Sequence, residues 1–265
     1  MIIDGKALAE QVYEELTARR AAFSRTPRLG IVVASKDPVI ESFVAIKAQI
    51  AQRLKVELMR ADLEAAAGTA GVITAVQRLV ASADGIIVQL PLPDSVDVNA
   101  ALSSIPDDKD VDAISTATDR HVVDAPVARA VALILQHAGV DLKGKRAVVV
   151  GAGRLVGVPA AALLKKLGAK VSMFTLEEGS IYDLKTADIV VCGAGNPGFI
   201  KPEHVKNGVA LIDAGTSEQS GKVVGDCDSA CADVASVFTP VPGGVGPIAV
   251  AMIFKNLFDL IEKKS

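Results

Sequence analysis

Short apolar runs alternate with longer amphipathic segments along most of the chain. In the longer segments apolar residues recur every three or four positions, which predicts helices, whereas the short runs, rich in Val, Ile and Leu, are typical of strands in a parallel sheet. The alternation indicates an α/β fold. It predicts strands at 28–34, 56–61, 85–93 (running into a proline-rich turn), 146–150, 170–174, 187–192 and 209–213, and helices at 5–24, 39–54, 68–81, 99–104, 124–138, 157–167 and 248–263.

A glycine turn separates the predicted strand 146–150 from the predicted helix 157–167. Gly151 and Gly153 allow a tight turn and a close approach of backbone N–H groups to a pyrophosphate at the positive end of the helix. The third glycine, Gly157, comes one residue later than in the usual dinucleotide motif, and a strand–helix turn without any cofactor fits the same residues. Because a further strand follows within the length of a βαβ unit, we predict a dinucleotide site.

Length and composition narrow the class of protein. The chain has 265 residues, 50% of them hydrophobic, which is enough for two domains. A net charge of −3 gives no basic footprint for nucleic acid or an anionic membrane, and no apolar run approaches the roughly 20 residues that span a bilayer. The N-terminus lacks the build of a signal peptide. We therefore expect a cytoplasmic protein with a small-molecule site.

The cysteines and histidines do not form a metal-binding pattern. Cys227 and Cys231 lack a second pair of ligands, and the histidines at 121, 137 and 204 are widely scattered. We expect no metal site, and reduced, partly buried thiols at all three cysteines, including Cys192.

Polar residues near the ends of predicted strands form a candidate substrate site. Phe43 and Lys47 are four residues apart and share a helix face, although a surface lysine beside a core phenylalanine gives the same pattern. Gln89 is either a hydrogen-bonded core amide or a site residue at the carboxyl end of a parallel strand. Most acids of the loop 105–112 are expected to be solvated, but Asp112, flanked by apolar residues, is a candidate to point inward.

Two further features point to ligand binding. Small residues follow the predicted strands 187–192 and 209–213, as they do strand 146–150, and so leave room for a ligand across the sheet edge. The loop 238–247 is rich in glycine and proline, and we expect it to hold backbone groups in fixed positions.

Four separated motifs stand in a diagnostic order. They are Asp37-Pro38 with Lys47, Gly85-Ile-Ile-Val-Gln-Leu-Pro-Leu-Pro93, Lys109-Asp-Val-Asp112 and Thr239-Pro-Val-Pro-Gly-Gly-Val-Gly-Pro247. In order and spacing they resemble the bifunctional methylenetetrahydrofolate dehydrogenase/cyclohydrolase (FolD) family, as do shorter phrases around 149–159, 195–201 and 225–226. The resemblance covers nearly the whole chain.

The resemblance implies a fold of two α/β domains with a cleft between them. Residues 1–125 with 246–265 would form the N-terminal catalytic domain, which binds folate, and residues 126–245 a Rossmann-like, doubly wound parallel-sheet domain that binds NAD or NADP. The C-terminal helix would pack on the N-terminal domain, and the protein would be a homodimer formed through the cofactor domain.

The resemblance also implies roles for single residues. Lys47 would handle protons and activate water during hydrolysis, Gln89 would orient Lys47, and Asp112 would hydrogen-bond the pterin ring. Phe43 would lie beside the folate. Further substrate contacts would come from the backbone at Pro242, Gly243 and Gly246, and cofactor contacts from Gly151, Ala152, Gly153, Arg154, Gly157, Thr175, Glu177 and Thr216.

Three departures from the family pattern change the expectation. Phe43 stands where the family has tyrosine, so the ring is kept and the hydroxyl that partners the lysine is lost. The stretch 125–131 lacks the family's Pro-Cys-Thr-Pro sequence. Thr175-Leu176-Glu177 replaces a polar, basic run that NADP-dependent members use, so we expect NAD to be preferred; a solvated Glu177 that contacts nothing is the alternative.

These observations lead to one principal functional hypothesis. The chain is expected to oxidise methylenetetrahydrofolate with NAD or NADP and to hydrolyse the methenyl product, with hydrolysis weakened. One alternative is a catalytically reduced paralogue of the same fold with a binding role. Another is a different two-domain dehydrogenase that acts on a small acid.

Overall fold

The computed structural model describes residues 1–115, 122–175, 177–219 and 221–264, and it confirms the α/β class. The chain forms two compact units, one of Met1–Gln11 with Ala125–Met252 and one of Val12–Asp124 with Ile253–Ser265. We call them the glycine-turn unit and the Lys47 unit. The domain limits expected from the sequence stay a prediction.

The predicted helices and strands are present in the predicted order. The α-helices are α1 (Gly5–Arg20), α2 (Pro38–Arg53), α3 (Gly68–Val80), α4 (Val98–Ser103), α5 (Pro126–His137), α6 (Gly157–Lys166) and α7 (Val245–Glu262). The strands are β1 (Arg28–Val33), β2 (Glu57–Asp62), β3 (Gly85–Val88), β4 (Arg146–Val150), β5 (Lys170–Phe174), β6 (Ile189–Cys192), β7 (Ala210–Asp213), β8 (Ser217–Gln219), β9 (Lys222–Val224) and β10 (Val237–Phe238). The structure thus adds the strands β8, β9 and β10, which were not predicted.

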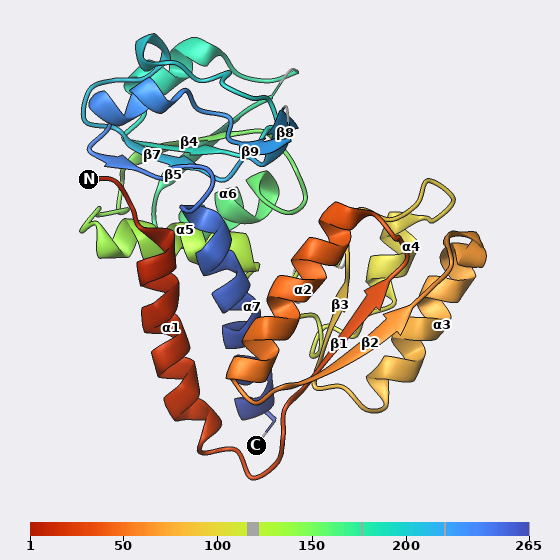
Figure 1. Cartoon of the computed structure of the whole chain (residues 1–265). Coiled ribbons are helices and arrows are strands. Elements are labelled where there is room, and N and C mark those ends of the chain that lie inside the picture. Colours follow the sequence, from red (N-terminus) through yellow and green to blue (C-terminus); the bar gives the residue numbers. More distant parts are fainter. Residues whose placement is uncertain (116–121, 176, 220, 265) are drawn as a thin grey trace. The chain divides into compact units, whose positions relative to one another are not determined.

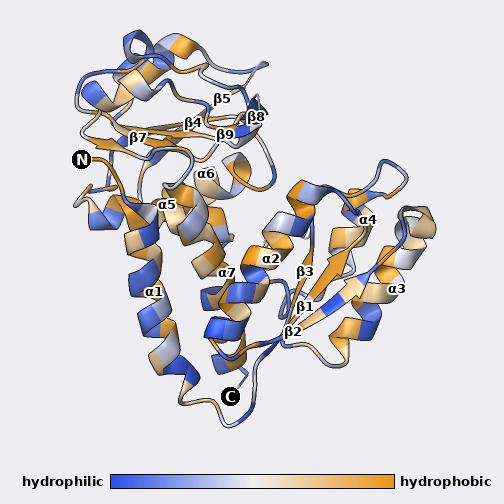
Figure 2. Ribbon diagram, in the orientation of Figure 1, coloured by the Kyte–Doolittle hydropathy of each residue, from blue (hydrophilic) through white to orange (hydrophobic). Residues whose placement is uncertain are grey.

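A parallel three-stranded sheet forms the centre of the Lys47 unit. Its strand order is β2-β1-β3 (Figure 1). In the register of the sheet, Leu29 of β1 lies opposite Leu58 of β2 on one side and Gly85 of β3 on the other. The strands β1 and β3 are almost wholly apolar, whereas the edge strand β2 mixes polar and apolar residues (Figure 2). One face packs on α3 and α4 through a core that includes Val32, Val76, Ile86 and Leu102. The sheet therefore fixes the ends of β1 and β3, from which the candidate site extends.

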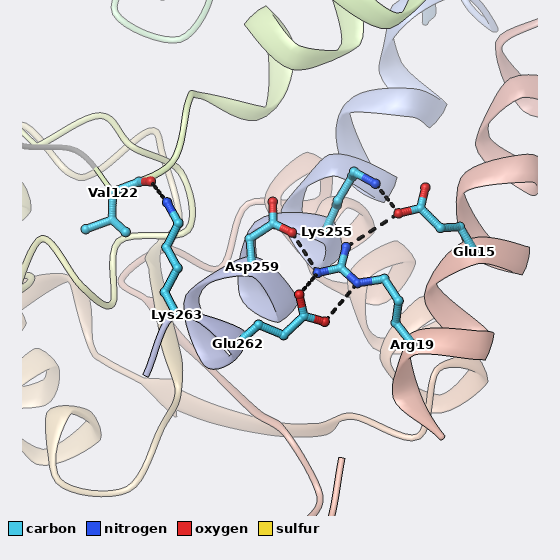
Figure 3. Close-up of polar contacts among 7 residues, drawn as sticks. All are labelled: Glu15, Arg19, Val122, Lys255, Asp259, Glu262 and Lys263. Atoms are coloured by element: carbon cyan, nitrogen blue, oxygen red, sulfur yellow. Dashed lines mark hydrogen bonds and ion pairs between the residues drawn. The ribbon is translucent and has the colours of Figure 1, made fainter. Parts of the chain in front are cut away.

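Within the Lys47 unit, charged and aromatic contacts join α7 to α1 and to the turn that follows α1. Arg19 donates to Asp259 at 2.7 Å and to Glu262 at 2.8 and 3.0 Å, and Lys255 pairs with Glu15 (Figure 3). The Phe23 ring packs edge-on against Phe258, with centroids 4.9 Å apart. Most of these ion pairs are exposed, so the apolar packing contributes more to stability.

Two predicted helix ends differ from the structure by three residues or more, and the others by at most two. The helix predicted at 5–24 ends at Arg20, because the N–H groups of residues 21–23 bond to carbonyls only three residues earlier, which forms tighter turns. The helix predicted to start at 248 begins at Val245. Pro247 is tolerated there because the first turn of a helix leaves its N–H groups without helical partners.

The glycine-turn unit contains a five-stranded parallel sheet. Strands β4, β5 and β7 of this sheet are labelled in Figure 1. The strand order is β10-β7-β6-β4-β5, and Ile2, the second residue of the chain, forms a bridge with Phe238 of the edge strand β10. Numbered along the chain this is the order 2-1-3-4-5 of doubly wound folds, in which the winding direction reverses between β4 and β6. Ligands bind at such a reversal point, so the residues after β4 and β6 are the candidate cofactor site.

Candidate active site and cofactor site

Lys47 is held by a helix whose start is well defined. The Asp37 side chain caps α2 by accepting a hydrogen bond from Val39 N at 2.7 Å, and Pro38 occupies the first turn. Two and a half turns later Lys47 is only 8% exposed, and its Nζ donates to Gln89 Oε1 at 2.9 Å. Lys47 is therefore a buried amine with a fixed partner, and the surface-lysine alternative is wrong.

Gln89 lies immediately after β3. Its backbone N–H continues the sheet by donating to Val32 O at 2.9 Å, and its Nε2 donates to Leu90 O at 2.8 Å. The amide oxygen is thereby aimed at Lys47, because the amide nitrogen already has an acceptor. Gln89 is therefore a hydrogen-bonded buried amide at the carboxyl end of a parallel strand, and its role as a site residue stays a prediction.

Asp112 completes a charged group with Lys47. The side chain is half-buried, and burial, together with the nearby Asp110 carboxylate, raises the pKa of Asp112 to about 7, while Lys47 opposes that rise. Burial lowers the pKa of Lys47, and the Asp112 charge opposes this shift. An amine and a carboxyl with pKa values moved toward neutrality can exchange protons near neutral pH. We refer to Lys47, Gln89 and Asp112 as the Lys47 group.

Asp112 also gives stability a pH dependence. The folded pKa of about 7 exceeds the value of about 3.9 in an unfolded chain, so the free energy of unfolding falls as pH rises through this window. Asp112→Asn removes this titration. As pH rises from about 5 to about 8, the free energy of unfolding of the variant is therefore expected to increase by about 1–2 kcal/mol relative to that of the wild type, a range that allows for the partial exposure of the side chain. Urea unfolding at several pH values measures this difference.

Asp108→Asn is the matched control for this measurement. The Asp108 carboxyl accepts a hydrogen bond from Lys264, which lowers the pKa of Asp108. Its contribution to the free energy of unfolding therefore changes only at more acidic pH. A difference between Asp112→Asn and the wild type that stays constant across the window would contradict the raised pKa of Asp112.

Phe43 lies one turn before Lys47 on α2 and is 45% exposed. The alternative that Phe43 is a core residue is therefore wrong.

A cavity of about 370 Å³ opens at the carboxyl ends of β1, β2 and β3. It is lined by residues 34–37, Ile40, Leu63, Glu64 and residues 91–93. The Lys47 group does not line it.

The candidate cofactor site is built around the turn after β4. Gly151 has φ +93°, and a Cβ there would lie 2.7 Å from Gly193 O, in the turn after β6. A Cβ at Gly157, the first residue of α6, would collide with Gly151 O. Glycine is required at both positions because the two turns and the start of α6 approach so closely. Backbone packed in this way can accept a phosphate near the N-terminus of α6.

The other predicted cofactor residues surround the same end of the sheet. Ala152 and Gly153 are exposed, Arg154 is half-buried, and Thr216 is exposed after β7. Thr175 follows β5, and its hydroxyl accepts hydrogen bonds from the N–H groups of Glu177 and Glu178 at 3.2 and 3.0 Å. Glu177 itself is exposed. The structure thus brings the predicted cofactor residues to the carboxyl ends of β4, β5 and β7.

Sequence reasoning missed two buried carboxylates beside this site. Asp226 accepts hydrogen bonds from the N–H groups of residues 194–196, after β6, and Asp213, at the end of β7, accepts from Gly215, Asp226 and Cys227. Burial raises the pKa of Asp213 to about 6. Because Asp226 accepts from the turn after β6 and its own N–H donates to Asp213 at the end of β7, the two side chains connect the turns after β6 and β7 by hydrogen bonds. An apolar strand that ends in an aspartate was the available signal for Asp213.

The three cysteines are free thiols. Cys227 Sγ lies 3.5 Å from Cys192 Sγ, a contact between distant residues that the 227–231 spacing did not suggest. Burial raises the pKa of Cys231 to about 12. In the described residues no group of three or more His, Cys, Asp or Glu side chains could hold a metal ion, and His121 lies outside those residues.

The predicted folate-binding backbone belongs to the glycine-turn unit. Pro242 is exposed, and Gly243, with φ +105°, accepts a hydrogen bond from Gly5 N at 2.9 Å. Gly246 was expected in a loop and instead lies in the first turn of α7. The loop 239–244 is thus held to the start of α1, and its part in folate binding stays a prediction.

Comparison with known proteins identifies the family. Residues 3–112 match the tetrahydrofolate dehydrogenase/cyclohydrolase, catalytic domain, and residues 125–265 match the NAD(P)-binding domain of the same family. The chain belongs to the tetrahydrofolate dehydrogenase/cyclohydrolase family. A relative from Methanoculleus marisnigri, "Bifunctional protein FolD", is 37% identical across 97% of this chain and 95% of its own. The resemblance inferred from the motifs is confirmed.

Solved structures of the tetrahydrofolate dehydrogenase/cyclohydrolase family have the same fold. The bifunctional FolD enzyme of Campylobacter jejuni matches with a TM-score of 0.94 and 29% identity, covering 100% of this chain and 99% of that one. The FolD of Trypanosoma brucei, solved with NADP and an inhibitor, matches with a TM-score of 0.91 and 32% identity, covering 100% of this chain and 98% of that one.

The described residues contain no helix with the length and apolar character needed to span a membrane.

Proposed function

We propose that this protein oxidises 5,10-methylenetetrahydrofolate with a nicotinamide dinucleotide and hydrolyses the methenyl product to formyltetrahydrofolate. The observation that carries the proposal is the Lys47 group, in which a buried amine, an amide and a carboxyl converge inside a chain of this family. Bifunctional relatives that match along nearly the whole chain support the same reaction pair.

The dehydrogenase step places few demands on acid–base groups. The methylene carbon lies between two nitrogens whose lone pairs stabilise the cation that remains when hydride leaves, so the step depends mainly on positioning. A bound nicotinamide would supply the hydride acceptor. The turn at 151–153 and the start of α6 fit its pyrophosphate, because glycine is required there by close backbone contacts.

Hydrolysis requires proton transfer, and Lys47 is the residue suited to it. Burial lowers the pKa of its amine, so a larger fraction is neutral near neutral pH and able to take a proton from water. Gln89 holds the amine in one direction. Asp112 would hydrogen-bond the pterin ring and, with a pKa near 7, is present in both protonation states at neutral pH.

A coupled spectroscopic assay tests the proposal. Purified protein with methylenetetrahydrofolate and NAD or NADP is expected to produce the reduced nicotinamide, and methenyltetrahydrofolate supplied alone is expected to be hydrolysed faster than in buffer. Binding of both ligands without turnover would identify a catalytically reduced paralogue. Binding of the nucleotide but no folate would favour a different dehydrogenase.

NAD is expected to bind more tightly than NADP. Glu177 lies just after β5, where it could accept hydrogen bonds from a ribose 2′-hydroxyl, whereas a 2′-phosphate would meet like charge costing about 1–2 kcal/mol, or about tenfold in affinity. Fluorescence titration measures both dissociation constants. Glu177→Gln should bring the two constants closer together.

Glu178→Gln is the matched control, because it removes the same charge from the adjacent exposed residue. Equal or tighter binding of NADP by the wild type would mean that Glu177 is solvated and contacts no ribose.

We also propose that the protein forms a homodimer through the cofactor domain. Sedimentation equilibrium would test this proposal.

A further inference from the structure

Asp110 stands out among the acids of the loop that leads to Asp112. The sequence suggested that most of these acids are solvated, but Asp110 is 1% exposed. It forms a bridge with Ile86 of β3, and Ile86 N donates to Lys109 O at 2.7 Å, so residues 109–110 are added to the edge of the sheet. A carboxylate at this depth must be compensated by hydrogen bonds.

The compensation comes from four consecutive backbone N–H groups. Asp110 Oδ1 accepts from Asp112 N at 3.1 Å and Ala113 N at 2.9 Å, and Oδ2 accepts from Ile114 N and Ser115 N, both at 3.1 Å. One side chain thus determines the path of residues 112–115. We call this arrangement the Asp110 clamp.

The backbone inside the Asp110 clamp is unfavourable by itself. Ala113 has φ +51°, the left-handed region that a residue with a Cβ adopts only at a cost of about 1 kcal/mol or more. Such a conformation persists where its surroundings enforce it. Asn256 of α7 adds support, because its fully buried Nδ2 donates to Val111 O at 2.7 Å and Asp124 O at 2.9 Å.

We propose that Asp110 is a positioning residue that holds Asp112 beside Lys47 through these four backbone hydrogen bonds. Asp110 acts on the site in two ways. It fixes the turn that carries Asp112, and its negative charge favours the protonated form of Asp112, while the charge of Lys47 favours the ionised form. Lys47 and Asp110 are the charged groups facing Asp112 in the described residues, and Gln89 is the nearby neutral partner of Lys47. The inference rests on the proposed function, in which Asp112 contacts the folate.

Asp110→Asn in the full-length enzyme tests both effects. The amide can accept from two of the N–H groups but turns a donor toward the other two, so the KM for methylenetetrahydrofolate should rise about tenfold or more, with a smaller change in kcat. Loss of the negative charge should move the pH profile of kcat/KM toward lower pH. NAD affinity should be unchanged. Asp110→Glu keeps the charge but misplaces the turn, so it should raise KM without moving the profile.

Two controls isolate the role of Asp110. Asp108→Asn alters an exposed acid in the same loop, paired with Lys264, and should leave KM and the pH profile at wild-type values. In an Asp112→Ala background, Asp110→Asn should have little further effect on folate KM, because a residue that acts through Asp112 has nothing left to position. Additive effects of the two substitutions would overturn the proposal.

The wild-type protein provides a test that requires no variant to fold. The amides of residues 112–115 should exchange with solvent slowly, as expected for N–H groups bonded to a buried carboxylate, and fast exchange would overturn the proposal. If the wild type is active and the two variants Asp110→Asn and Asp108→Asn have the same KM for folate, the positioning role is refuted and the proposed function remains intact. A wild type without activity on folate would refute the proposed function, while amide exchange would still test the clamp.

Discussion

Lys47→Met is expected to reduce hydrolysis of methenyltetrahydrofolate by about 10²–10⁴-fold while leaving NAD binding unchanged. The buried amine donates to Gln89 and has a pKa lowered by burial, so its replacement removes the group best suited to proton transfer in the Lys47 unit. Hydride transfer moves no proton and should fall less than hydrolysis. Rates of both half-reactions and a titration with NAD measure the effect.

Stability should change little in Lys47→Met. A lysine with a lowered pKa in the folded state destabilises the protein while it carries its charge, and methionine has a similar length without that charge. The loss is limited to the hydrogen bond with Gln89, worth about 1 kcal/mol. Lys6→Met, on the exposed side of α1, controls for removal of one positive charge. Undiminished hydrolysis in Lys47→Met would remove Lys47 from the mechanism.

Local pattern predicted the framework of this site well. The helix expected at 39–54 is Pro38–Arg53, because its apolar residues repeat with helical period and Asp37-Pro38 marks its start. Gln89 stood out as the one polar residue of an apolar strand, and it indeed lies at the strand's carboxyl end against Lys47. These features depend on residues that are close together in the sequence, so the pattern of a single sequence is enough to predict them.

The features that were missed depend on contacts distant in sequence or on backbone conformation. The Asp110 clamp requires a left-handed Ala113 that no propensity favours, and the three-residue strands β8 and β9 are too short to show an apolar alternation. Asn256 was readable by the argument applied to Gln89, since it is an amide inside an apolar helix, but its acceptors lie more than 130 residues earlier. Sequence could indicate a buried polar residue there without revealing its partners.

Phe43→Tyr is expected to raise the rate of methenyltetrahydrofolate hydrolysis about tenfold or more and to change the dehydrogenase rate less. Phe43 lies one turn before Lys47. If, as the resemblance implies, the family carries tyrosine at this position, the substitution returns a hydroxyl that can partner the amine. A well-placed proton-handling group is worth about 10²–10⁴-fold, and only part of that effect is at stake because Gln89 already orients Lys47. Rates of both half-reactions, wild type against variant, provide the measurement.

The exposure of Phe43 makes this substitution a clean test. Burying an unpaired hydroxyl at a core position would cost about 1–3 kcal/mol of stability, but on a side chain that is 45% exposed a hydroxyl that is not bonded to Lys47 can bond to water. The melting temperature should therefore stay close to that of the wild type. Phe23→Tyr, at a ring packed against Phe258 away from Lys47, controls for the added hydroxyl. If Phe43→Tyr leaves hydrolysis unchanged while stability is retained, the missing hydroxyl does not limit hydrolysis, and the stretch 125–131, which also departs from the expected family pattern, becomes the next feature to test.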